Sequence, residues 1–175
     1  MKRMKALIAT GMAVMLCVAS SLTVMASTGY KSQWQNFPQI AQGTSYSGYT
    51  KAVQRIVRDY SKTCRDIIGD NSGVDGSFGT KTYNAVVEFQ KGKGCSKTNG
   101  IVGPETWGKL DDVLSYDCTV YFSNDGNFQM YKGTGCYYTN FVIRRGTGSG
   151  NWAVRTSTGG TSEATNGTYQ TFKAY

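Results

Sequence analysis

Two stretches of the chain match each other at a spacing of 24 residues: positions 75–82 read DGSFGTKT and positions 99–106 read NGIVGPET. Each begins with Asp-Gly or Asn-Gly, a pair that favours a turn in which the glycine has a positive φ. A second glycine follows three positions later, where a helix can begin, and Pro104 suits the first position of a helix. Each stretch therefore predicts a turn that leads into a helix, over residues 80–91 in the first copy and 104–113 in the second.

A third helix is predicted before the first turn. From Tyr49 to Tyr60, apolar residues recur at intervals of three and four positions, as they do along one stripe of an α-helix. The charged residues of this segment, among them Arg55, Arg58 and Asp59, lie mostly off that stripe. The residues expected to face a shared core from the two later helices are Tyr83, Val86, Val87, Phe89, Trp107 and Leu110.

The pattern changes after Leu114. Residues 118–122 and 128–131 alternate aromatic or aliphatic residues with polar ones, and the Asn-Asp-Gly at 124–126 between them is typical of a β-hairpin. Further strands are predicted at 137–143, 152–154 and 168–172. The predicted fold class is therefore α+β, with an N-terminal three-helix bundle over residues 48–114 and a small antiparallel β unit over residues 115–175.

The β unit is dense in aromatic residues, with seven Tyr, four Phe and one Trp between Tyr116 and Tyr175. These side chains can form the core of a small sheet, or they can form an exposed surface that stacks on sugars. The sequence of this segment resembles no family that we recognise, and its role stays open.

The first 26 residues are predicted to be a secretory signal peptide. They have a basic start, an uncharged apolar run over residues 6–24, and small or aliphatic residues before the expected cleavage after Ala26. The apolar run is also about long enough for a membrane anchor, but its Gly, Ser and Thr content favours removal. A lipoprotein acylated at Cys17 is disfavoured, because Leu16 stands where a small residue is required.

Export would leave a mature chain of about 149 residues. Residues 27–47 are polar, show no sustained period, and are predicted to be a linker or a loosely docked arm. Removal of three basic residues with the signal peptide lowers the formal net charge from +8 to +5, which suits adhesion to an anionic surface. The remaining basic residues are scattered, so neither a nucleic acid nor, after cleavage, a membrane is expected as a partner.

Four cysteines remain after cleavage, and an even number in an exported chain predicts disulfides. Four cysteines allow three pairings. We expect Cys64 to pair with Cys95 and Cys118 to pair with Cys136, because each bond then stays within one segment. The chain has no CxxC spacing and no histidine, so no metal site is predicted, and no other cofactor is expected.

Catalysis is not expected either. Without histidine the chain cannot build a Ser-His-Asp or Cys-His site, or a zinc site of the kind used by many wall peptidases. Carboxylates for glycoside hydrolysis are present, but Asp111 and Asp112 are better explained as a solvated helix end. The helical segment and the β segment are also short, so they have little surface with which to form the long cleft that a glycosidase needs.

Four motifs of the helical segment together resemble the peptidoglycan-binding domain family: VQRIV at 53–57, VDGSFGTKT at 74–82, AVVEFQ at 85–90 and NGIVGPETW at 99–107. The resemblance covers one module of about 65 residues and none of the rest of the chain. It implies a three-helix bundle that recognises peptidoglycan, usually as the targeting part of a cell-wall enzyme.

The chain departs from the family pattern at two places. Residues 61–72 are longer than the usual turn and are expected to add a loop tied by a disulfide through Cys64. Asn99 stands where Asp is usual, which keeps the turn chemistry and removes one charge.

Groups that can reach solvent beside the two turns are the candidate ligand contacts. A glycan strand offers hydroxyls and acetamides that need hydrogen-bond partners, and flat sugar faces that stack on aromatic rings. The glycines and apolar residues of the motifs are better explained as turn and core positions, and Trp107 can also belong to the core. The candidate contacts are Asp75, Thr82, Tyr83, Asn99, Thr106 and Trp107.

The sequence thus predicts a secreted, non-catalytic peptidoglycan-binding protein that is extracellular or associated with the cell wall. Two alternatives stay open. In one, the β unit over residues 115–175 is the catalytic part of a wall hydrolase, or binds a second ligand. In the other, the chain is a secreted effector or inhibitor that uses the helical module as a tether.

Overall fold

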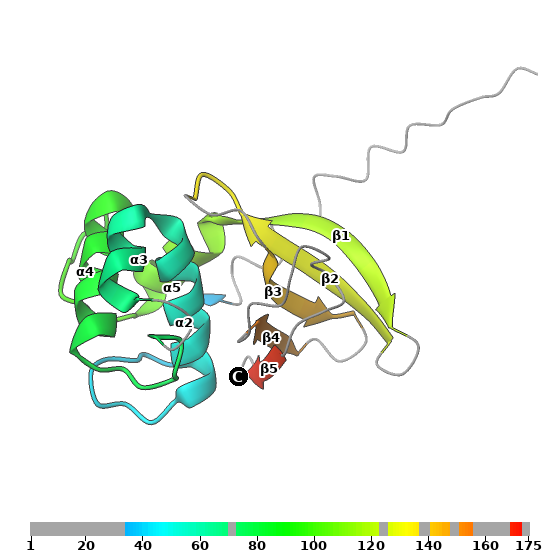
Figure 1. Ribbon diagram of the computed structural model, residues 1–175, viewed down its shortest axis with the longest axis horizontal. Coiled ribbons are helices and arrows are strands. Elements are labelled where there is room, and N and C mark those ends of the chain that lie inside the picture. Colours follow the sequence, from blue (N-terminus) through cyan, green and yellow to red (C-terminus); the bar gives the residue numbers. More distant parts are fainter. Residues whose placement is uncertain are drawn as a thin grey trace, which may run out of the picture.

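The computed structural model describes residues 34–69, 73–122, 126–136, 141–147, 151–155 and 169–172. It confirms the α+β class, because helices make up the first part of the described chain and a five-stranded antiparallel sheet makes up the second (Figure 1). The predicted signal peptide, residues 1–26, lies outside the described residues. Over the ranges given above, no helix is both long enough and apolar enough to cross a membrane.

Four helices are described before the sheet, one more than predicted. Those that correspond to the predicted helices are α2 (Ser47–Tyr60), α4 (Thr80–Gly92) and α5 (Pro104–Asp112). Their ends lie within two residues of the predicted ends wherever the sequence specified one.

The additional helix, α3 (Lys62–Ile68), falls in the stretch predicted to be a disulfide-tied loop. The Ser61 hydroxyl caps it by accepting a hydrogen bond of 3.1 Å from the backbone N–H of Cys64. Lys62 and Asp66 form an ion pair one turn apart. Gly69 follows the helix with a φ of 87°, which a residue with a side chain rarely adopts. The helix is thus explained by signals within its own sequence.

The sheet is a meander in which each strand pairs with the next along the chain. The strands are β1 (Leu114–Phe122), β2 (Gly126–Gly133), β3 (Phe141–Gly146), β4 (Trp152–Arg155) and β5 (Tyr169–Phe172). Tyr131 pairs with Ile143 and Ile143 with Val154, so these residues share one face. All three are buried in the same core as the helices. Residues 123–125 and 137–140, which hold most of the predicted hairpin turn and the start of a predicted strand, lie outside the described residues.

The core joins three parts of the chain: the helices, the sheet and the segment of residues 34–46, which we call the N-terminal arm. Trp34 of the arm packs against Trp107 of α5 and Trp152 of β4, with ring centroids 5.9 and 5.2 Å apart, and all three side chains are fully buried. Ile40 exchanges two backbone hydrogen bonds, of 3.1 and 2.9 Å, with Val102. The described part of the predicted linker is therefore an ordered part of the core.

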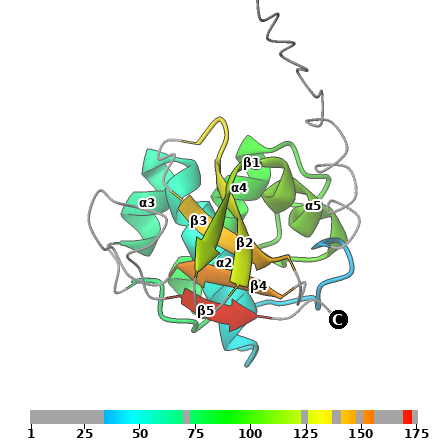
Figure 2. The ribbon, with the colours of Figure 1, turned by 90° about the vertical axis from the view of Figure 1, so that its right-hand side faces the viewer.

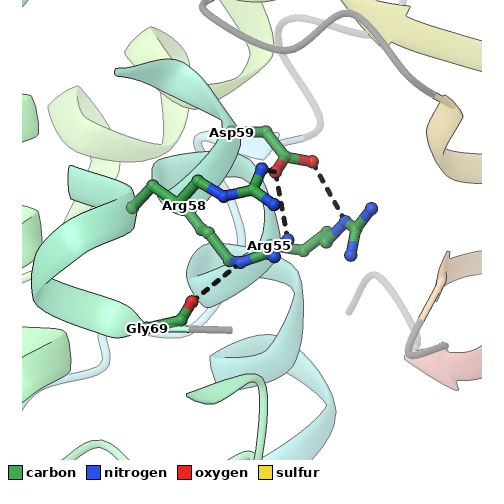
Figure 3. A network of polar contacts seen from close by, with 5 residues as sticks. Arg55, Arg58, Asp59 and Gly69 are labelled. Atoms are coloured by element: carbon green, nitrogen blue, oxygen red, sulfur yellow. Dashed lines mark hydrogen bonds and ion pairs between the residues drawn. The ribbon is translucent and has the colours of Figure 1, made fainter. Parts of the chain in front are cut away.

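Helix α2 lies at the boundary between the other helices and the sheet (Figures 1 and 2). Three of its charged residues are buried along with most of its apolar ones: Arg55, Arg58 and Asp59 are at most 3% exposed. The Asp59 carboxylate forms ion pairs with both arginines, at 3.1 Å from Arg55 Nε and 3.3 Å from Arg58 Nη1 (Figure 3). Arg58 Nε also donates a hydrogen bond to the carbonyl oxygen of Gly69 at 3.0 Å. Burial raises the pKa of Asp59, and the nearby guanidiniums oppose this.

The cysteines correct the predicted disulfide pairing, because the bond expected between Cys64 and Cys95 is not formed and both residues are free thiols. The Cys64 thiol is buried on α3 and donates to the carbonyl oxygen of Ala85 at 3.6 Å, in the middle of α4. Cys95 follows the end of α4, which is about 10 Å further along the helix axis. Cys136 is also a free thiol, so the bond expected between Cys118 and Cys136 is not formed either.

Candidate functional site

The first turn is built around the buried side-chain amide of Gln54, from the middle of α2. Its Nε2 lies 2.9 Å from Asp75 Oδ1, 3.0 Å from the carbonyl oxygen of Ser77 and 2.9 Å from Thr82 Oγ1. Its Oε1 accepts the backbone N–H of Gly76 at 2.9 Å. One glutamine thus holds the start, the middle and the helical end of this turn.

The second turn is built in the same way around Gln90, near the end of α4. Its Nε2 donates to the carbonyl oxygen of Ile101 at 2.8 Å and to Thr106 Oγ1 at 2.9 Å. Its Oε1 accepts the backbone N–H of Gly100 at 2.9 Å, the equivalent of the Gly76 bond. The sequence repeat is therefore also a structural repeat. Sequence reasoning missed the role of the two glutamines, although Gln54 belongs to the VQRIV motif and Gln90 ends the AVVEFQ motif.

The glycines of the repeat have the predicted conformations. Gly76 and Gly100 have φ values of 84° and 69°, as the turn interpretation requires. Gly79 and Gly103 are the residues from which α4 and α5 begin, and Pro104 is the first residue of α5.

The six predicted contact residues fall into two groups, one at each turn, and most are engaged inside the protein. Thr82 and Thr106 are 3% and 4% exposed and bond to the glutamines. Trp107 is fully buried, and its indole Nε1 donates to the carbonyl oxygen of Pro38 at 3.0 Å, as the core interpretation of this residue requires. Tyr83 is partly buried beside Gly100.

Asp75 and Asn99 are the exposed members of these groups. Asp75 Oδ1 accepts the backbone N–H of Ser77 at 2.8 Å, and Asn99 Oδ1 accepts that of Ile101 at 3.1 Å. Each side chain therefore stabilises its own turn and still presents polar atoms to solvent. The ligand-binding role of all six residues stays a prediction.

A hollow lies beside each turn. The first has a volume of about 320 Å³ and is lined by Asp75, Thr80 and Lys81, among others. The second, of about 370 Å³, is lined by residues that include Asn99 and Glu105. Both hollows take residues from equivalent positions of the repeat, since each contains the central glutamine and the buried threonine. The two turns therefore form two related polar surfaces.

The second hollow carries a fixed negative charge. Both oxygens of Glu105 are used: Oε1 accepts the backbone N–H of Ser96 at 2.8 Å, and Oε2 accepts its hydroxyl at 2.6 Å. These two hydrogen bonds lower the pKa of Glu105, and Lys109 and Lys97 lower it further. The carboxylate is therefore ionised at neutral pH. This arrangement suits recognition of a ligand by hydrogen bonds and charge. Within the described part of the chain, no cluster of His, Cys, Asp and Glu could hold a metal ion.

Comparison with known proteins finds two partial matches to this chain. A protein of Kitasatospora aureofaciens, named "Uncharacterized protein in bpoA1 3'region", is 60% identical over 46 residues, which is 26% of this chain and 38% of that protein. The match thus spans less than half of either chain. No solved structure matches the chain. A family model described as "Putative peptidoglycan binding domain" matches residues 50–110, the segment that holds both glutamine-centred turns, and this part of the chain is similar to that family.

Proposed function

We propose that this protein is a secreted, non-catalytic protein that binds the peptidoglycan of the cell wall through its helical module. The observation that carries the proposal is the pair of polar hollows at the glutamine-centred turns, within the family match of residues 50–110. Hydroxyls, amides and charged groups of peptidoglycan can pair with the polar groups that line these hollows. Secretion is supported by the signal-peptide pattern of residues 1–26.

The non-catalytic part of the proposal is supported by how the carboxylates are used. Glu88 pairs with Lys91 at 2.7 Å, Asp117 pairs with Lys132 at 2.6 Å, and Glu105 is held by Ser96. General acid catalysis at neutral pH needs a carboxyl group that has a raised pKa and can reach the substrate. The pKa of Glu105 is lowered, and Asp59, whose pKa is raised, is buried against Arg55 and Arg58. The chain contains no histidine that could replace such a group.

A sedimentation experiment tests the proposal. The mature protein, residues 27–175, is mixed with purified insoluble peptidoglycan and centrifuged, with cellulose as a control polymer. We expect the folded protein to pellet with peptidoglycan and to stay in solution with cellulose. Protein that stays in the supernatant while its circular dichroism spectrum shows a folded state would overturn the binding proposal. Sugars or peptides released into the supernatant would overturn the non-catalytic part.

Secretion is tested separately. Mass spectrometry of the protein recovered outside the producing cells should find Ser27 as the first residue. A chain that keeps residues 1–26 and stays with the membrane would contradict the proposed localisation.

A further inference from the structure

The N-terminal arm forms one wall of the second hollow, although it lies outside the family match. The side chain of Gln39 lines this hollow, and its Oε1 would lie 3.7 Å from a Cβ atom placed on Gly103. Gln35 lies over Gly108 of α5, where an added Cβ would be 3.2 Å from its Nε2. A side chain at Gly108 would therefore press on Gln35, whereas one at Gly103 would meet Gln39 at an ordinary contact distance, and both distances show that the arm lies close against the start and middle of α5.

The second hollow continues along α5. A neighbouring hollow is lined by Gln35, Gly108, Lys109 and Asp112, and it shares Glu105 with the hollow at the turn. These two adjoining hollows lie between the N-terminal arm and α5, and we call them together the arm groove.

The arm is held in place by bonds within the core. Ile40 pairs with Val102, and the carbonyl oxygen of Pro38 accepts the indole N–H of Trp107. Trp34 is fully buried at the start of the described arm. The backbone that carries Gln35 and Gln39 is therefore ordered before a ligand arrives, which lowers the entropic cost of binding.

The groups that line the arm groove indicate which part of peptidoglycan it fits. They include the amides of Gln35 and Gln39, the carboxylate of Glu105 and the ammonium group of Lys109. None of the described residues that line it is aromatic, whereas stacking on aromatic rings is a common way to bind the flat face of a sugar. A peptide carries amides, carboxylates and amino groups, which amides and paired charges can bind.

From this geometry we infer that the arm groove binds the peptide stem of peptidoglycan and that Gln39, from outside the family module, is one of its specificity-determining residues. The inference rests on the proposed function and adds to it the part of the polymer that is recognised. The arm also offers a matched comparison, because the exposed Gln42 lies outside the lining of the arm groove, with its Nε2 3.4 Å from Thr80 Oγ1.

The test is a calorimetric titration of the mature protein, residues 27–175, with two soluble probes: stem peptide released from peptidoglycan, and glycan chains from which the peptides have been removed. The variants are Gln39→Ala and, as the matched control, Gln42→Ala. Both glutamines are exposed, so both variants should keep the wild-type unfolding temperature. A third variant, Lys109→Gln, removes a charge from the groove without touching the arm.

We expect the stem peptide to bind and the peptide-free glycan not to bind. Gln39→Ala should weaken the affinity for stem peptide about 2- to 10-fold, the effect of losing one neutral hydrogen bond, and Lys109→Gln should weaken it by more. Gln42→Ala should leave the affinity unchanged.

Three results would overturn the inference: binding of the glycan alone, equal effects of Gln39→Ala and Gln42→Ala, or wild-type affinity in Lys109→Gln. If any of them occurs while the wild-type protein still pellets with peptidoglycan, the proposed function stands and the arm-groove inference falls. If the wild-type protein does not pellet at all, both fall.

Discussion

Arg55 and Asp59 lie one turn apart on α2 and form an ion pair of 3.1 Å in which each side chain is only 4% exposed. The same carboxylate lies 3.3 Å from Arg58 and 3.9 Å from Arg65. One buried carboxylate therefore interacts with three arginines at the boundary between the helices and the sheet. Burial removes these charged groups from water, which costs free energy. The attraction to the Asp59 carboxylate offsets that cost for the arginines.

Replacement of Asp59 should destabilise the protein strongly. Asp59→Asn keeps the shape of the side chain but leaves the buried arginines without this counter-charge, so we expect a loss of about 3–5 kcal/mol in the free energy of unfolding. Chemical denaturation of the purified protein measures it. The matched control is Asp66→Asn, whose pair with Lys62 is 61–67% exposed and should contribute no more than about 1 kcal/mol. Equal effects of the two changes would contradict the prediction.

The two central glutamines should be important for stability. Gln90→Ala leaves the buried N–H of Gly100 and the partners of the Gln90 amide without their bonds. We expect a loss of about 1–3 kcal/mol for each group left unsatisfied. Gln54→Ala should have a similar effect because its contacts are equivalent. Urea denaturation tests both, with the exposed Gln42→Ala as the control. A loss no larger than that of the control would show that water replaces the amide.

Gly100 should tolerate alanine less well than Gly94 does. Both glycines have a positive φ, 69° and 62°, so alanine should cost about 1–2 kcal/mol at each from backbone strain. An added Cβ at Gly100 would also lie 2.3 Å from the ring of Tyr83, while at Gly94 it would meet nothing within 4 Å. We therefore expect Gly100→Ala to lower the unfolding temperature further than Gly94→Ala. Equal shifts would mean that the Tyr83 ring moves aside freely.

Substitutions of Trp107 should affect peptidoglycan binding only through the stability of the fold. The side chain is fully buried between Phe37, Tyr49 and Trp34, so Trp107→Ala should cost about 3–5 kcal/mol. Trp107→Phe keeps a ring and loses the bond to Pro38, and should cost less. If Trp107→Ala weakens pelleting with peptidoglycan, thermal unfolding should show the same loss. A variant that unfolds like the wild type but no longer pellets would contradict the core role.

The stability contribution of Glu105 should depend on pH. Its hydrogen bonds to Ser96 lower its pKa below the ordinary value of 4.5, so the folded state favours the ionised form. This contribution is complete above the ordinary pKa and is lost as the pH falls through the lowered, folded-state pKa. The difference in unfolding free energy between wild type and Glu105→Gln should therefore be constant near neutral pH and change in favour of the variant below pH 4.5. A difference that does not vary with pH would contradict the assignment.

Much of the helical module follows from the sequence, because its signals are local. The turn at Gly76, the turn at Gly100 and the helix that begins at Pro104 are all where the motifs predicted them. The surroundings of the candidate site residues follow less directly from the sequence. The motif indicated the right turns, but the contact residues Thr82, Thr106 and Trp107 are buried, and the amides that organise the turns belong to residues distant in sequence. Helix α3 was not predicted, although its cap at Ser61 is local, because a helix of seven residues is too short for an apolar period to stand out in the sequence.

By itself the sequence determined the repeat of turn and helix, since a positive φ at glycine, a side-chain bond within a turn and a proline at a helix start depend only on neighbouring residues. Only the tertiary structure decided that Arg55 and Asp59 are buried and that the arm with Trp34 belongs to the core. Burial is a property of what covers a residue. Here β4 packs against α2, and Trp152 of the same strand packs against Trp34, far away along the chain. No local sequence pattern carries that information.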